Sequence, residues 1–435
     1  MNIPAIVVVA ITLVLMVLSI AFDWKVKIKK VTFALYWAIC LVGAIICLCV
    51  GFAGSTPIQS IFLAEGNINP LKILIIFLSC ASISVLLDKI GFFAYIAAVI
   101  LNKSKSSQTK LFFSFSAIIA ILTVFTSNDI LILTFTPFIC YFAKNAKIDP
   151  TPFIISEFVC ANVWSMFFYI DNPTNIYMCM KFDIGFFEYA MKMALPTISC
   201  GIFATFLVYL IFRKKLQVKI DIKEVEVVKP DRALLTIGVI GLATMVTLMA
   251  VSNYIPGVEL WYIPLVCSGA TFIACTICLL IKREKLTIVW KALLGLPYAL
   301  IPFLLSMSVF TASLKEAGFI QIFADFLSGQ HLYSVGLISF VAGNILNNIP
   351  MTMMFTDTLV LIENLPHNVV YAVIAASNIT ALLTPIGSLA GIMFMKILKQ
   401  NDVKYNFKQF VMYGSVISIP TILLALTIIN FVNFG

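Results

Sequence analysis

Residues 171–175 read Asp-Asn-Pro-Thr-Asn, and they interrupt an apolar run that otherwise extends from 151 to 180. A matching interruption lies in the second half of the chain, where residues 384–388 read Thr-Pro-Ile-Gly-Ser inside the apolar run 368–395. Proline removes a backbone donor and kinks or breaks a helix, and small polar residues flank it in both places. The two stretches predict a pair of broken membrane helices at corresponding positions of two repeats.

Two further apolar stretches, 111–143 and 333–362, are each broken near the middle by polar residues. The first break is Ser-Asn-Asp at 127–129, and the second is Asn-Asn-Ile-Pro at 347–350. Exposed backbone groups cannot face lipid, so such breaks must be buried in protein or line a polar cavity. We expect each stretch to form a re-entrant helical hairpin that enters and leaves the membrane on one side.

Apolar runs near 20 residues recur along the whole chain, which is the length needed to cross a ~30 Å hydrocarbon core. Of the 435 residues, 61% are hydrophobic and 11% are charged, whereas soluble proteins have about half apolar and about a quarter charged residues. The composition excludes a soluble fold and predicts a polytopic membrane protein. We expect full spans at 4–22, 32–54, 71–90, 151–180, 193–213, 233–252, 260–281, 292–314, 368–395 and 411–433.

Positive charge divides unevenly between the two sides that these spans define. Of the 29 Lys and Arg residues, all fall in loops on one side except Lys72, Lys181, Lys192 and Lys315. Basic residues stay in the cytoplasm, so both termini are expected outside, in a multi-pass protein of the plasma (inner) membrane. This bias accounts for the net charge of +9 without any nucleic-acid partner. It also requires re-entrant hairpins, because a full crossing would move later basic loops to the other side.

The two halves match in the order of their features, and the charge map starts them on opposite sides of the membrane. We therefore predict an all-α fold of two inverted repeats. Residues 1–213 form the first, with scaffold helices in 4–90, and residues 233–435 form the second, with scaffold helices in 233–314. A cytoplasmic linker at 214–232 joins them. Inverted repeats with interrupted helices at corresponding positions indicate a secondary transporter whose site lies near the midplane.

Four helix N-termini are expected to converge at that site, because each break begins a new half-helix. Asn128 or Asp129, Asn348, Asn172 and Thr384 are the expected caps. Free N–H groups and helix dipoles at such ends favour anionic or oxygen-rich ligands. The expected substrate-binding residues are Asn128, Asn172, Thr174, Asn175, Asn347, Asn348, Thr384, Gly387 and Ser388.

Three carboxylates lie at or near membrane depth, and an intramembrane ionisable residue marks a functional candidate. Asp129 at a hairpin tip and Asp171 in a break are the expected ligands of a coupling ion, H⁺ or Na⁺. Glu157 lies seven residues into its span, and we expect it near the cytoplasmic face, where water solvates it. Nearly all 11 cysteines fall inside apolar runs, and no Cys/His spacing predicts a metal site.

At these residues the chain resembles the arsenite-efflux permeases of the ion transporter superfamily, which also holds sodium/proton antiporters and citrate or dicarboxylate carriers. The similarity covers roughly 71–213 and 292–433. The matching motifs are Asn128-Asp129 at the first hairpin, Asn172-Pro173-Thr174-Asn175, Leu346-Asn347-Asn348-Ile349-Pro350, and Thr384-Pro385-Ile386-Gly387-Ser388-Leu389-Ala390. The resemblance adds Asn378 to the substrate-binding candidates. It also implies an elevator mechanism, in which the hairpins and broken helices move against a dimeric scaffold.

The sequence departs from that family at two places near the expected site. Arsenite permeases carry Asn-Leu-Gly-Pro before the second-half signature, whereas here Thr380-Ala381 replaces Gly-Pro. Asp171 stands where relatives have Gly or Ser. Both changes bear on the choice of substrate.

Efflux of arsenite or antimonite, coupled to proton or sodium entry, is the function that we expect first. A carboxylate at Asp129 repels an anionic substrate unless it is protonated or paired with a cation, whereas a neutral trihydroxide can donate hydrogen bonds to it. An arsenite pump would also take a soluble ATPase as partner. The alternatives are a cation-coupled citrate or dicarboxylate carrier and a sodium/proton antiporter. Motifs typical of hydrolases are absent from the sequence, and inverted repeats argue against a static channel.

Overall fold

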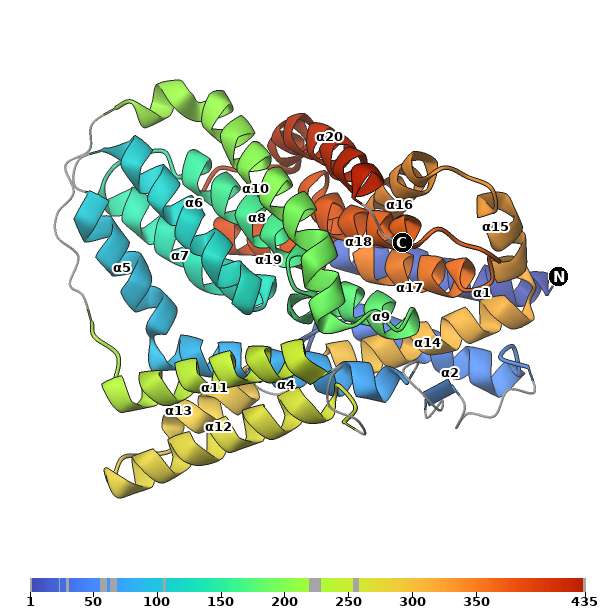
Figure 1. Ribbon diagram of the computed structural model, residues 1–435, viewed down its shortest axis with the longest axis horizontal. Helices are drawn as coiled ribbons and strands as arrows, with labels where there is room; N and C mark the ends of the chain where they lie inside the picture. Colours follow the sequence, from blue (N-terminus) through green and yellow to red (C-terminus); the bar gives the residue numbers. More distant parts are fainter. Residues whose placement is uncertain are drawn as a thin grey trace.

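Figure 1 shows the computed structural model, which describes residues 2–22, 24–28, 31–54, 61–62, 69–104, 107–218, 228–252 and 258–432. For residues 28, 31–33, 104 and 171, only the backbone is described. Residues 219–227 of the expected linker lie outside the described residues.

The first half of the described chain is almost entirely helical, with one two-stranded sheet near its start. It opens with α1 (Ile3–Ala21), β1 (Lys25–Ile28), β2 (Val31–Ala34), α2 (Tyr36–Val50), α4 (Pro70–Ile90) and α5 (Phe92–Ser104). They are followed by the hairpin limbs α6 (Gln108–Phe125) and α7 (Asn128–Asn145). The broken helix and the last helix follow as α8 (Thr151–Val163), η1 (Trp164–Met166), η2 (Tyr169–Asp171), α9 (Pro173–Lys181) and α10 (Phe186–Leu216).

The second half repeats this order of helices. It opens with α11 (Arg232–Val251), α12 (Tyr262–Ile281), α13 (Thr287–Leu294), α14 (Leu300–Glu316) and α15 (Phe319–Leu327). The hairpin limbs are α16 (Leu332–Leu346) and α17 (Asn348–Leu359). The broken helix and the last helix are α18 (His367–Ile379), η4 (Thr380–Leu382), η5 (Pro385–Gly387), α19 (Leu389–Gln400) and α20 (Phe407–Phe431). The breaks predicted at 127–129, 171–175, 347–350 and 384–388 are all confirmed as helix interruptions.

Among the described residues, seven helices are long and apolar enough to cross a membrane: α1, α4, α6, α10, α11, α12 and α20. Helices α14 and α15 meet at 82° and add an eighth span if they are counted together. Large apolar side chains face outward along these helices, and Ile11, Ile202 and Ile273 are each more than half exposed. A surface of this kind requires lipid around it, so the chain is a multi-pass membrane protein.

The region between α1 and α2 corrects the all-α prediction, because the span expected at 32–54 begins instead with a strand. Strands β1 and β2 form an antiparallel pair in which Lys25 lies opposite Ala34. Lysine alternates with β-branched residues at 25–28, and this alternation is typical of a strand with one solvated face. Helix α2 is therefore only 15 residues long, and Gly51 ends it with a φ of +77°.

Two other expected spans differ in their bounds. The run 292–314 is divided between α13 and α14, because Gly295 ends α13 and Pro297 follows before α14 starts. Glycine favours a helix end and proline cannot continue a helix in mid-course. Helix α10, expected at 193–213, is 31 residues long and keeps Pro196 in its interior.

The hairpins and broken helices of the two halves pack across each other. The second hairpin limb of the first half, α7, packs against α19, and its counterpart α17 packs against α9. Helix α8 also contacts α18, and α10 packs along α20. These contacts bring the four helix interruptions of the chain into one region near the middle of the molecule (Figure 1).

Candidate functional site

Three of the four interruptions begin a new helix with a side-chain cap. Asn172 Oδ1 accepts the N–H of Thr174 at 3.2 Å, which confirms its expected capping role. Asn347 Oδ1 accepts the N–H of Ile349 at 3.3 Å, so Asn347 and not Asn348 caps α17. Ser388 Oγ caps α19 by accepting the N–H of Gly391 at 3.0 Å.

The remaining expected caps are wrong. Helix α7 begins after Ser127, which makes no side-chain cap bond, so Asn128 and Asp129 lie inside the first turn. Asn128 Oδ1 instead accepts the N–H of the neighbouring Asp129 at 2.8 Å. Thr384 precedes η5 but its side chain makes no cap bond either. These side chains are therefore available for contacts other than capping.

Asn378 is the centre of a buried polar network that joins the two broken helices. Its Oδ1 accepts hydrogen bonds from Ser165 Oγ at 2.8 Å and Asn172 Nδ2 at 3.0 Å. Its Nδ2 donates to Asn175 Oδ1 at 2.7 Å. All four residues are at least nine-tenths buried. One amide from the second half therefore holds three side chains of the first half.

The same network reaches both hairpins. Thr174 Oγ1 lies 3.2 Å from Ser377 Oγ, and the Ser377 carbonyl accepts from Asn348 Nδ2 at 3.3 Å. At the first hairpin, Asn128 Nδ2 donates to Asn162 Oδ1 at 3.4 Å, and the Asn162 carbonyl accepts from Ser165 Oγ at 2.7 Å. The structure thus brings six of the expected substrate-binding residues into one region: Asn128, Asn172, Thr174, Asn175, Asn348 and Asn378.

A second polar cluster surrounds the break in the second half. Thr384 Oγ1 donates to Asn344 Oδ1 at 2.9 Å, and Asn344 Nδ2 lies 2.6 Å from Thr380 Oγ1. A Cβ added to Gly387 would lie 2.5 Å from the Thr380 carbonyl oxygen, so this glycine permits a close backbone approach. Asn347 Nδ2 donates to the Ile386 carbonyl at 3.0 Å. Thr384, Gly387, Asn347 and the cap Ser388 therefore shape the break.

Amides and hydroxyls alone make the side-chain contacts described for both clusters, and no Lys, Arg or His takes part in those contacts. Most of these groups bind one another. Within the described residues, the buried Asn348 Oδ1 has no hydrogen-bond partner, and neither has Thr352 Oγ1 one turn further along α17. Both are free to accept a hydrogen bond from a solute hydroxyl.

The three carboxylates lie in three different settings. Asp129 is half-buried on the first turn of α7, in the neighbourhood of the Tyr36 hydroxyl of α2. No described contact joins it to Asn378. The side chain of Asp171 lies outside the described residues, although its backbone belongs to η2. Glu157 is fully buried, so the expectation that water solvates it is wrong.

Four members of the two clusters escaped the sequence prediction: Asn162, Ser165, Asn344 and Ser377. A usable signal was present for two of them. Ser165 precedes Asn172 by seven residues, and Ser377 precedes Thr384 by the same interval. A polar residue two helical turns before a break lies on the same face of the helix as the residue that begins the break.

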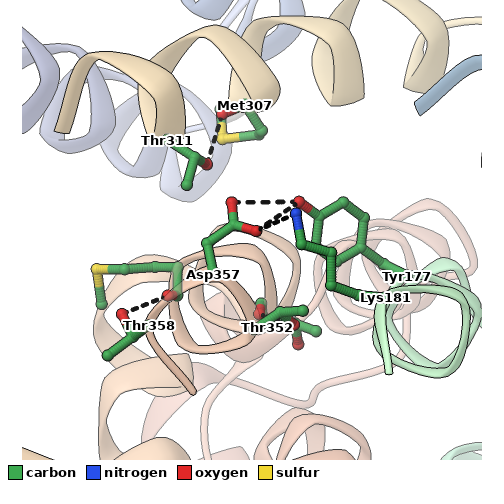
Figure 2. A network of polar contacts seen from close by, with 9 residues as sticks. Tyr177, Lys181, Met307, Thr311, Thr352, Asp357 and Thr358 are labelled. Carbon is green, nitrogen blue, oxygen red and sulfur yellow. Dashed lines mark hydrogen bonds and ion pairs between the residues drawn. The ribbon is translucent and has the colours of Figure 1, made fainter. Parts of the chain in front are cut away.

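An ion pair joins the two halves at the far end of α9. Lys181 Nζ lies 2.8 Å from Asp357 Oδ1 on α17, and both side chains are about 15% exposed. Tyr177 OH lies 3.4 Å from each oxygen of the same carboxylate. In Figure 2, Tyr177 and Lys181 approach Asp357 from the same side. Helix α14, which carries the labelled Met307 and Thr311, lies across from the carboxylate. Lys181 is the last residue of α9, where the helix dipole also favours a cation.

We expect this pair to stabilise the contact between α9 and α17. Lys181→Met and Asp357→Asn should each lower the free energy of unfolding by about 1–3 kcal/mol, because each leaves a largely buried polar group without its partner. In the double variant the two losses should not add, and a thermal-unfolding cycle should give a coupling energy of at least about 0.5 kcal/mol. The more exposed pair Lys215–Asp149 is a control. Additive losses at Lys181 and Asp357 would show that the pair contributes no coupling.

Comparison with known proteins gives concordant results. A family model described as citrate transporter matches residues 1–364. The chain is 25% identical over 378 residues to a putative arsenical pump membrane protein of Bacillus subtilis (strain 168), covering 80% of this chain and 84% of that protein. It is 23% identical over 367 residues to an arsenical pump membrane protein of Escherichia coli, with the same coverage.

A solved structure shares the fold. The YdaH transporter of Alcanivorax borkumensis aligns with a TM-score of 0.57, covering 98% of this chain and 97% of that one. The sequence identity is 12%, so this likeness concerns the fold alone.

Proposed function

Because this chain belongs to the citrate transporter family, we propose that it exports a small inorganic solute, arsenite or antimonite, coupled to the entry of protons or sodium ions. The family and the relatives make the chain a membrane transporter and not an enzyme. This proposal concerns the solute, the coupling ion and the direction of transport. The names of the arsenical pump relatives support arsenite as the first candidate.

One observation carries the choice of solute: the network around Asn378 consists of neutral amides and hydroxyls. A buried tricarboxylate needs cations or many donors around it, whereas a neutral trihydroxide needs acceptors and donors of the kind present here. The free acceptors Asn348 Oδ1 and Thr352 Oγ1 suit the hydroxyls of such a solute. Asp129, near the tip of the first hairpin, is our candidate for the coupling ion.

A citrate or dicarboxylate carrier is the second candidate, and the family description favours it. The capped N-termini of α9, α17 and α19 carry partial positive charge that can bind carboxylate oxygens. Such a substrate would need sodium ions or protons to neutralise it beside Asp129.

We further propose that the halves are inverted repeats and that the hairpins are re-entrant. Three features support this. The same order of helices occurs in both halves. Hairpin α6/α7 lies in the left part of Figure 1 and hairpin α16/α17 in the right part. Each second limb packs against a half-helix of the other repeat. An elevator mechanism would move these elements as one body against the scaffold helices α1, α2, α4, α11, α12 and α14. A homodimer would join two such scaffolds.

We expect the two hairpins to be accessible from opposite sides of the membrane. Cysteines placed beside Lys103 and Lys144 should react with an impermeant reagent only from the cytoplasm. Cysteines beside Ser334 and Glu363 should react only from outside. Both termini would then be outside in the inner membrane. Labelling of the Lys103 and Lys144 neighbours from opposite sides would contradict a re-entrant first hairpin, and it would agree with α6 as a full span.

The test of the solute is a thermal-shift and uptake screen of the purified protein with arsenite, antimonite, citrate, succinate, phosphate, sodium and lithium. We expect arsenite and antimonite to raise the unfolding temperature and to exchange across proteoliposome membranes. A shift by citrate or succinate alone would favour the second candidate. A response to sodium or lithium without any of the other solutes would favour an antiporter. For an arsenite pump, a soluble ATPase partner should raise arsenite efflux when it is co-expressed.

A further inference from the structure

Glu157 is a fully buried carboxyl group in the middle of α8. Thr136 Oγ1 on α7 donates to its Oε2 at 2.9 Å. The other oxygen, Oε1, is buried without a hydrogen-bond partner among the described residues. The solute network described above does not include this side chain. A buried acid that the solute site does not use needs another explanation.

The surroundings of Glu157 contain no compensating cation among the described residues. The thiols of Cys140 on α7 and Cys160 on its own helix lie near it and carry no positive charge. The neighbouring helices α6, α7, α10 and α18 carry their charged residues and their histidine in or near their end turns. An ionised carboxylate has about four acceptor sites and needs a partner charge when it is buried. One threonine hydroxyl cannot meet that need, so the geometry suits the neutral acid.

Glu157 also lies between one end of α8 and the solute network. It follows Thr151, the first residue of α8, by six residues, or about 9 Å along a helix. It precedes Asn162 by five residues, or about 7.5 Å. Two side-chain hydrogen bonds therefore join helices α7 and α8. One is Asn128–Asn162 at the hairpin tip, and the other is Thr136–Glu157 further along.

We propose that Glu157 binds a transported proton, so that H⁺ is a coupling ion of this carrier; the proposal rests on the secondary transport proposed above. The step adds one proton to a carboxylate oxygen and later removes it, and no other bond forms or breaks. The proton is held while α7 covers Glu157. Pro137 follows Thr136 and removes one helix hydrogen bond, so α7 can bend next to Thr136. Bending that withdraws Thr136 admits water and releases the proton.

The proton on Glu157 can be observed without any solute. Infrared difference spectra of the reconstituted protein between low and high pH should contain the carbonyl band of a buried protonated carboxyl group. Glu157→Gln should remove that band, and Glu188→Gln, at a more exposed position on α10, should leave it unchanged. Thr136→Val should shift the band, because it removes the hydrogen bond to Oε2. This variant also serves if Glu157→Gln does not fold. A band that neither variant alters would overturn the proposal.

Transport separates this proposal from the one on which it rests. With a pH gradient as the only driving force, Glu157→Gln should lose solute accumulation while solute exchange without a gradient survives. Accumulation at the wild-type level by Glu157→Gln would overturn the coupling role even if the infrared band is lost. If the wild type neither binds nor exchanges any solute of the screen, the proposed function fails, while the infrared result still decides whether Glu157 holds a proton.

Discussion

Asp129→Asn is expected to abolish ion-driven solute accumulation while solute binding and exchange persist. The substitution keeps the size of the side chain and removes its ability to ionise. Asp129 is half-buried near the tip of the first hairpin, in the neighbourhood of the Tyr36 hydroxyl on α2. A group in that position can bind a cation or proton in one conformation and release it in another. Accumulation should therefore fall to the level of protein-free vesicles.

The structure removes the simplest competing explanation for Asp129. The residue is not the cap of α7, because the helix begins after Ser127. Its remaining structural contribution is a negative charge in the first turn, worth about 0.3–1 kcal/mol. The variant should consequently unfold within a few degrees of the wild type. Wild-type accumulation by Asp129→Asn, under an imposed pH or sodium gradient, would exclude Asp129 from coupling and leave that role to Asp171 and Glu157.

Asn348→Ala should abolish solute transport with a small loss of stability. Asn348 Nδ2 makes one hydrogen bond of 3.3 Å to the Ser377 carbonyl, and Oδ1 has no partner among the described residues. Truncation therefore removes about 1 kcal/mol of stability but also removes the acceptor that we assign to the solute. The measurement is solute exchange in proteoliposomes, together with the unfolding temperature.

Asn378→Ala provides the contrast. It removes the hydrogen bonds that Ser165, Asn172 and Asn175 make to Asn378. Each buried group left unsatisfied lowers the free energy of unfolding by about 1–3 kcal/mol. It should therefore unfold at a clearly lower temperature than Asn348→Ala. Asn401→Ala, at the end of α19, is a control that should transport normally. Normal exchange by Asn348→Ala would place the solute away from the second hairpin.

The helix breaks could be predicted from the sequence because they depend on local chemistry. Pro173 and Pro385 each follow a polar residue within an apolar run, and backbone rules decide the outcome there. The caps were harder to assign. Asn347 and Asn348 are chemically identical neighbours, and the φ of +77° at Asn347 decides which of them is the cap. Asn347 Nδ2 also donates to the Ile386 carbonyl, a partner 39 positions away that no local pattern contains.

The hydrogen-bond network lay beyond the sequence because its partners are distant in the chain. Asn378 and Ser165 are 213 positions apart, and the packing of η1 against α18 brings them together. Glu157 was misplaced for a related reason. Its position near the start of the span expected at 151–180 indicates access to water, but α6, α7 and α10 cover α8. Depth along one helix does not determine burial when other helices surround it.

The most direct measurement is arsenite flux into proteoliposomes under an imposed pH or sodium gradient, with the arsenite concentration inside already higher than outside. We predict that the wild type accumulates arsenite against its own gradient, and that Asp129→Asn and Asn348→Ala do not. Flux that only follows the arsenite gradient, and is unchanged when the ion gradient is removed, would contradict secondary active transport of arsenite by this chain.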